Sequence, residues 1–97
     1  MSLTEKQKKY LRKLGHTLEP VVLTGGDGVT PGLLAELDAT LAHHELVKVR
    51  VRAGDRATRD ETIRALCEAS GAEIVQRIGH VALLWRPNPE RRRVELP

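Results

Sequence analysis

Apolar and polar positions follow two periods along the 97-residue chain, and each change of period predicts a new element. Over residues 3–18 the apolar side chains fall on an arc of about 100° at helical spacing, and the basic side chains lie on the far side. Thr4 and Gln7 fit a capping box at the start of this helix, and Gly15 weakens it near its end. Residues 46–52 instead alternate strictly between apolar and basic positions, which is typical of a half-buried strand.

The rest of the pattern predicts five further elements. They are a strand over residues 20–24, a helix from Thr30-Pro31 to His43-His44, a helix over 56–70 that stops at Gly71, and strands over 72–78 and 81–86 joined by a turn at Gly79-His80. The order α-β-α-β-α-β-β favours parallel pairing across each crossover and an antiparallel final hairpin. We therefore expect an α/β chain of the two-layer α+β kind, with three helices on a four-stranded mixed sheet. We expect residues 1–97 to form a single domain with a basic tail at about 87–97.

Positive charge is gathered in a few places, although the net charge is only +3. Residues 21–46 contain no Lys or Arg and carry four acids, whereas the helix before them and the strand after them are basic. The clustered cations are Lys6, Lys8, Lys9, Arg12 and Lys13 in the first helix and Lys48, Arg50 and Arg52 in the strand. This segregation favours a polyanionic partner, and the alternative is ordinary solvated surface charge.

Several protein classes do not fit the sequence. It has no apolar run long enough to cross a membrane, and its first residues lack the apolar core of a secretory signal. A single cysteine, Cys67, cannot close an intramolecular disulfide and lies on the apolar stripe of the third helix, so we expect it in the core. These features predict a cytoplasmic protein.

Gly25-Gly26-Asp27-Gly28 lies between a predicted strand and a predicted helix, where a glycine-rich turn can cradle phosphate. The lysine of a P-loop is missing after Gly28, and the spacing Gly26, Gly28, Gly32 departs from the dinucleotide fingerprint. We therefore expect no nucleotide cofactor. A simple connector and a contact with a nucleic-acid backbone both remain open for this loop.

Candidate catalytic groups are sparse. His43-His44-Glu45 invites attention, but adjacent helical residues point about 100° apart, and histidines at a helix C-terminus also suit its dipole. We expect no catalytic residues, no metal site and no enzymatic activity.

With no Phe, one Tyr and one Trp, the chain also lacks a multi-aromatic platform for stacking bases, and both aromatics are expected in the core. Nucleic-acid binding would then depend on Lys and Arg contacts to the backbone.

Five short stretches spread over nearly the whole chain form an ordered set of motifs. They are Leu3-Thr4-Glu5-Lys6-Gln7, Pro20-Val21-Val22-Leu23, Gly25-Gly26-Asp27-Gly28-Val29-Thr30, His43-His44-Glu45-Leu46-Val47-Lys48-Val49, and Gly79-His80 through Trp85-Arg86-Pro87. This set resembles the CRM domain (chloroplast RNA splicing and ribosome maturation), and the chain is most similar to its stand-alone bacterial member.

The resemblance implies a sheet of order 1-2-4-3, similar to the C-terminal domain of translation initiation factor three. It also implies RNA binding through the GxxG loop, Gly25 to Gly28, and the nearby basic surface. The implied partner is structured ribosomal RNA in precursors of the large ribosomal subunit, whose assembly the protein would assist. Asp27 departs from family versions with a basic residue in the loop, which moves the expected contacts toward the first helix and the 46–52 strand.

Two other functions are consistent with parts of the pattern. The acidic second helix could dock on a basic ribosomal protein, which would make the chain a protein-interaction module. Less favoured is a small enzyme that holds a phosphorylated substrate in the glycine loop. For the RNA-binding function we expect a monomer with no membrane or DNA partner.

Overall fold

The computed structural model describes residues 3–24, 29–52 and 55–97, and in these ranges three helices and four strands follow one another in the order that the sequence predicts. In chain order they are α1 (Glu5–Gly15), β1 (Val21–Thr24), α2 (Pro31–His44), β2 (Leu46–Arg52), α3 (Arg56–Ser70), β3 (Glu73–Ile78) and β4 (Val81–Trp85). The expected α-β-α-β-α-β-β order is confirmed. The first helix is shorter than its apolar stripe, because α1 ends at Gly15 and Leu18 lies beyond it.

Side-chain caps explain where the helices begin. Thr4 and Gln7 form the reciprocal capping box expected for α1. Thr30 accepts the backbone N–H of Leu33 at 3.1 Å at the start of α2, and Asp55 accepts that of Thr58 at 2.7 Å at the start of α3. Each cap satisfies a backbone donor that the first helical turn leaves without a partner.

The four strands form one sheet in the order β1-β2-β4-β3, which is the order that the resemblance implies. β1 runs parallel to β2, whereas β4 is antiparallel to both β2 and β3. Ile78 pairs with Val81 across the expected two-residue turn, and Gly79 adopts a φ of 57° there. Glycine suits this position because a side chain at positive φ would be strained.

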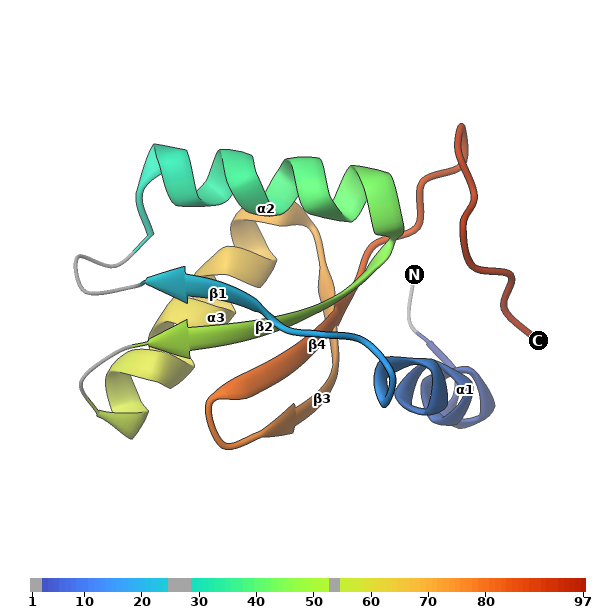
Figure 1. Ribbon diagram of the computed structural model, residues 1–97, viewed down its shortest axis with the longest axis horizontal. Helices are drawn as coiled ribbons and strands as arrows, with labels where there is room; N and C mark the ends of the chain where they lie inside the picture. The colour runs from blue at the N-terminus through green and yellow to red at the C-terminus, as the bar shows by residue number, and fades with distance from the viewer. Residues whose placement is uncertain (1–2, 25–28, 53–54) are drawn as a thin grey trace.

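The helices cover both faces of this sheet, so the expected two-layer arrangement is wrong. Val47, Val49 and Val51 of β2 pack beneath α2 and α3, in the larger of two core clusters. The smaller cluster lies on the opposite face, where Leu11 of α1 packs with Trp85 of β4. Figure 1 shows α2 and α3 together and α1 apart from them. The reason is that β4 has buried apolar side chains on both faces, and each face needs a cover.

Gly15 lets α1 approach the sheet closely. A Cβ at this position would lie 2.7 Å from Cδ2 of Leu83, a buried side chain of β4. The sequence suggested that this glycine weakens the end of the helix, and the structure adds that its missing side chain creates room for Leu83. The close contact places the last turn of α1 directly on the sheet.

The C-terminal tail is held against the domain by a buried carboxylate. Glu45, which follows α2, is fully buried, and its Oε2 accepts the backbone N–H of Asn88 at 2.6 Å. Its Oε1 accepts the backbone N–H groups of Arg93 and Val94 at 2.6 and 2.9 Å. Val94 and Leu96 then pack against the smaller core cluster. The basic tail expected at 87–97 is thus attached to the domain through backbone hydrogen bonds and apolar contacts.

Candidate functional site

The basic face of α1 lies opposite the side chain that anchors this helix. Leu11 is fully buried, whereas Lys6, Lys9 and Lys13 are exposed and Lys8 and Arg12 are half-buried. The amphipathic pattern therefore divides α1 into an anchored face and a cationic face, as the sequence predicts.

The sequence predicts both aromatic residues in the core, and the prediction is right for one of them and wrong for the other. Trp85 is only 4% exposed and belongs to the core, as expected. Tyr10 was expected there too, but it is 37% exposed. The helix buries Leu11 against the sheet, whereas Tyr10 lies at the margin of the apolar stripe and lines an open hollow beside Val94 of the tail.

The basic row of β2 lies on the same face of the sheet as α1. Lys48 is half-buried and Arg50 and Arg52 are exposed, on the side opposite the buried valines of this strand. Alternate side chains of a strand are about 6.6 Å apart, close to the spacing of phosphates along a nucleic-acid strand. The alternation that the sequence shows therefore becomes a row of three cations beside a cationic helix.

Two adjoining hollows connect the helix to this row. Arg12, His16 and Lys48 line the first hollow, together with Ile78 and Val81. Arg50, Arg52 and His80 line the second, which shares Ile78 and Val81 with the first. We call this continuous surface the basic groove, lined by Arg12, His16, Lys48, Arg50, Arg52 and His80. It brings together cations that are up to forty positions apart in the chain, from Arg12 to Arg52.

The cations of the groove are not neutralised by acids in the part of the chain that the structure describes. Glu73 was the nearest candidate partner for the β2 row, but β4 separates β3 from β2, and no ion pair joins Glu73 to Lys48, Arg50 or Arg52 in residues 3–24, 29–52 and 55–97. On α1, Lys8 lies 4.0 Å from the exposed carboxylate of Glu5, a weak contact in water. The positive charge of the groove is therefore open to a ligand.

The predicted GxxG loop, Gly25, Gly26, Asp27 and Gly28, lies outside the described residues. The last described residue before it, Thr24, pairs with Arg52 in the register of β1 and β2. The basic row therefore ends level with the carboxyl end of β1, the strand that precedes this loop.

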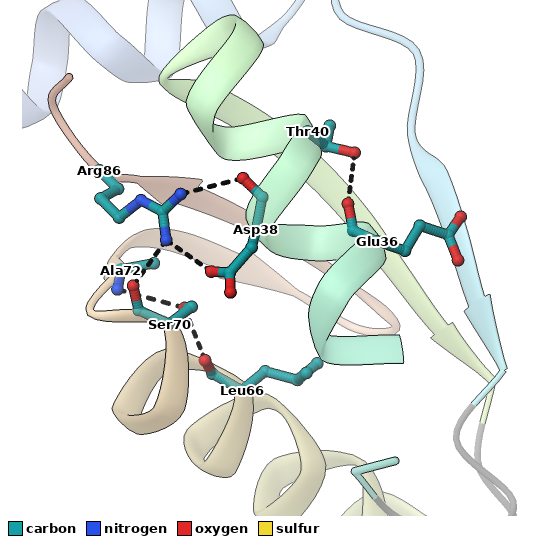
Figure 2. A network of polar contacts seen from close by, with 7 residues as sticks. All are labelled: Glu36, Asp38, Thr40, Leu66, Ser70, Ala72 and Arg86. Carbon is teal, nitrogen blue, oxygen red and sulfur yellow. Dashed lines mark hydrogen bonds and ion pairs between the residues drawn. The ribbon is translucent and has the colours of Figure 1, made fainter. Parts of the chain in front are cut away.

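Two of the three described acids in the acidic segment, residues 21–46, are bound to other groups of the domain. Nη1 of Arg86 donates to Oδ1 of Asp38 at 2.6 Å and to the carbonyl oxygen of Ser70 at 2.8 Å, as Figure 2 shows. Glu45 is buried beneath the tail, and in the described part of this acidic segment only Glu36 has an exposed carboxylate outside an ion pair. A docking surface for a basic protein would need unpaired exposed acids, and here Glu45 is buried and Asp38, although half exposed, is already paired with Arg86, so the geometry does not favour that alternative.

The two histidines at the end of α2 and the single cysteine were the other candidate reactive groups of the sequence. His43 and His44 are exposed in the last turn of α2, with ring centroids 5.4 Å apart and planes at 82°. Burial raises the pKa of the Cys67 thiol to about 11, so it stays protonated at neutral pH and is a poor nucleophile. Among the described residues, no cluster of three or more His, Cys, Asp or Glu side chains could hold a metal ion. No helix in the described ranges has the length and apolarity to span a membrane.

The sequence interpretation did not include three arginines that meet in a separate hollow. Arg56 and Arg59 of α3 and Arg77 of β3 line this hollow together with Gly79. The spacing of Arg56 and Arg59, three residues apart in a predicted helix, places them on one face and was a usable signal. Arg77 is distant in sequence, and only the pairing of β3 with β4 brings it to the same place.

Comparisons with known proteins agree on one family. An "RNA-binding protein" of Haemophilus influenzae is 46% identical over 96 residues, which cover 99% of this chain and 96% of that protein. A "Probable RNA-binding protein" of Bacillus subtilis is 33% identical over 95 residues, which cover 98% of this chain and 99% of the relative. The solution structure of a hypothetical Staphylococcus aureus protein, described as a candidate for RNA binding, matches with a TM-score of 0.78 at 36% identity, covering 99% of this chain and 100% of that one.

The family is shown by a match that spans most of the chain. Residues 3–86 fit the CRS1 / YhbY (CRM) domain, from the start of the described N-terminal segment through β4 to Arg86. All three helices and all four strands of the described structure lie within this range. By this match, and by the relatives that align along nearly its full length, the chain belongs to the CRS1 / YhbY (CRM) domain family.

Proposed function

We propose that this protein binds RNA through the basic groove and the cationic face of α1, and that its RNA is structured ribosomal RNA in precursors of the large ribosomal subunit. In this function it assists ribosome assembly as a cytoplasmic monomer without catalytic chemistry. The observation that carries the proposal is the convergence of α1 and β2 cations on one face of the sheet. The names of the relatives support RNA as the ligand.

The composition of the surface supports contacts to the RNA backbone over recognition of bases. Lysine and arginine neutralise phosphates irrespective of sequence, whereas base stacking needs exposed aromatic rings. Trp85 is buried, and Tyr10 lies on α1 away from the basic row. We therefore expect shape and charge to dominate binding.

A triple variant tests the groove directly. Replacing Lys48, Arg50 and Arg52 with Gln should leave the fold intact, because these side chains form no ion pairs within the described residues and surface charges add little stability. Affinity for a fragment of large-subunit RNA should fall by at least about tenfold at low salt. The readout is fluorescence polarisation, with circular dichroism to verify folding.

The matched control removes the same charge from elsewhere. Arg64 lies on α3 between Glu61 and Glu68, and Arg91 and Arg92 are exposed in the tail. Replacing these three arginines with Gln should weaken binding far less than the groove variant. Equal losses in the two triple variants would mean that only net charge matters, and the groove would not be the site.

The glycine loop is part of this proposal and needs its own test. We propose that the backbone of Gly25 to Gly28 lies against RNA phosphate, so that a side chain at Gly28 would block the approach. Gly28→Asp should then reduce the free energy of RNA binding by more than it reduces the free energy of unfolding. A folded variant that binds like the parent would leave the loop with a connecting role only.

Crosslinking tests which RNA is bound. The protein is crosslinked in cell extract, and the attached RNA fragments are sequenced. Fragments of large-subunit precursor RNA should be enriched over those obtained with the groove triple variant. Enrichment of messenger or small-subunit RNA instead would contradict the ribosomal part of the proposal.

A further inference from the structure

The three arginines that meet near the β3–β4 turn form a second cationic hollow, on the other face of the sheet. Arg77 pairs in register with Ala82, whose side chain lies in the core beneath α2 and α3. Arg56 and Arg59 extend from the first turn of α3 toward the same place. We call this surface the arginine hollow, lined by Arg56, Arg59, Arg77 and Gly79.

The arginine hollow and the basic groove meet at one point of the chain. Gly79, at the tip of the β3–β4 turn, borders the hollow on one side and the groove on the other. The sheet separates the rest of the two surfaces, because the Arg50 and Arg52 side chains lie on the α1 side. Two cationic surfaces thus flank a single narrow hairpin tip.

The hollow retains positive charge after its acids are counted. Asp60 forms an ion pair with Arg77, and Asp55 caps α3 through the N–H of Thr58. Three arginines therefore face two aspartates, and neither Arg56 nor Arg59 has an ion-pair partner within the described residues.

Two guanidinium donors in this hollow also lack a hydrogen-bond partner. Nε of Arg59 and Nε of Arg77 are buried, and neither donates to an acceptor among the described residues. Oδ1 of Asp60, the ion-pair partner of Arg77, is likewise buried without a hydrogen-bond partner in the described ranges. Because the buried Nε atoms have no exposed surface, an anion in the hollow would contact the terminal N–H groups of the arginines. Arginine presents several N–H groups in a plane, which suits the oxygens of a phosphate.

We propose that the arginine hollow binds the phosphates of a second segment of the RNA backbone, so that RNA is held on both sides of the β3–β4 turn. This inference rests on the proposed function. It also narrows the ligand, because two sites on opposite faces of a sheet suit a folded RNA that offers two backbone segments. A short single strand reaches the basic groove alone.

The experiment compares a double variant with a charge-matched control on two RNAs. Arg56→Gln with Arg59→Gln removes two charges from the hollow and spares the Arg77–Asp60 ion pair. Arg64→Gln with Arg91→Gln removes two charges from outside the hollow. Each protein is titrated with an RNA hairpin and with a short single strand over a range of salt concentrations.

The hollow variant should bind the hairpin at least about fivefold more weakly than the control at low salt, with a log–log salt slope shallower by about one to two. Its affinity for the short single strand should equal that of the control. Hairpin affinity and slope equal to the control would overturn the second site. If the double variant does not fold, the single variant Arg56→Gln, at an exposed side chain, takes its place.

The outcomes separate this inference from the proposed function. Failure of the unaltered protein to bind either RNA would contradict RNA binding itself. Hairpin binding that depends on the basic groove and not on the hollow would contradict only the second site. Inorganic phosphate is the remaining probe. Saturation of the hollow at millimolar phosphate, without effect on hairpin affinity, would assign it to a free anion and overturn the RNA contact.

Discussion

Arg86 and Asp38 are joined by two hydrogen bonds that connect the end of the sheet to the middle of a helix. Nη1 of Arg86 lies 2.6 Å from Oδ1 of Asp38, and Nη2 donates to the Asp38 backbone carbonyl at 3.0 Å. The same guanidinium donates to the carbonyl of Ser70, the last residue of α3. The Arg86 side chain, which follows β4, thus forms hydrogen bonds to both α2 and α3, as Figure 2 shows.

Replacing Arg86 with Lys should destabilise the fold by about 1–2 kcal/mol. A single ammonium cannot reach the carboxylate and both carbonyls in the planar geometry that the guanidinium provides. Urea denaturation measures the loss, and Arg64→Lys, on the exposed face of α3, serves as the control. RNA affinity should stay unchanged, since Arg86 lies outside both cationic surfaces. A stability equal to that of the Arg64 variant would mean that the network adds nothing.

Acid should release the tail through Glu45. Burial by itself would raise the pKa of this carboxyl, but the hydrogen bonds from the backbone N–H groups of Asn88, Val94 and Arg93 outweigh it and hold the pKa below its ordinary value. A carboxyl whose pKa is lower in the folded state stabilises that state above its unfolded pKa. This contribution should be fully present at neutral pH and lost as the pH falls below about 4.

Glu45→Gln should remove most of this acid dependence and cost about 1–3 kcal/mol at neutral pH, because the amide offers one acceptor oxygen where the carboxylate offers two. Hydrogen exchange should accelerate at the backbone amides of Arg93 and Val94. Glu45→Gly is a useful companion, since residue 45 has a φ of 62° that glycine tolerates. It should still release the tail. Retained protection in both variants would show that the apolar contacts of the tail suffice.

Gly15→Ala should destabilise the protein even though alanine is the better helix former. The new Cβ would lie 2.7 Å from the buried Leu83 side chain, which would have to move. We expect a net loss of about 1 kcal/mol, after a helix-propensity gain of about 0.5–1 kcal/mol. In a Leu83→Val background the same substitution should cost less, and this double-mutant cycle isolates the contact. If Gly15→Ala stabilises the protein, the close contact with Leu83 does not require glycine, and Gly15 only weakens the end of the helix.

RNA affinity should fall steeply with salt. If about five Lys and Arg side chains contact phosphates, the slope of log affinity against log salt should be roughly −3 to −4 on single-stranded segments. Titrations at several potassium chloride concentrations measure it. A slope near zero would contradict the backbone-contact mechanism, because ion release is what each phosphate contact contributes.

Local features of the sequence determined the element order, the helix starts and the two faces of β2. Thr4, Thr30 and Asp55 cap their helices through bonds to residues three positions away, so these signals need no knowledge of the fold. The alternation over residues 46–52 likewise assigns the valines and the cations to opposite faces. The ordered motifs, which are also local, indicated the family to which the chain belongs.

Tertiary structure decided which of these groups meet, because such contacts join residues that no local period relates. The fit of Gly15 against Leu83 places α1 on the second face of the sheet, and this brings Arg12 beside Lys48. Burial of Glu45 turns an acid that looked available for docking into the anchor of the tail. The pairing of β3 with β4 brings Arg77 to the arginines of α3. Charge and periodicity show that a side chain is cationic and outward-facing, but only packing determines its neighbours.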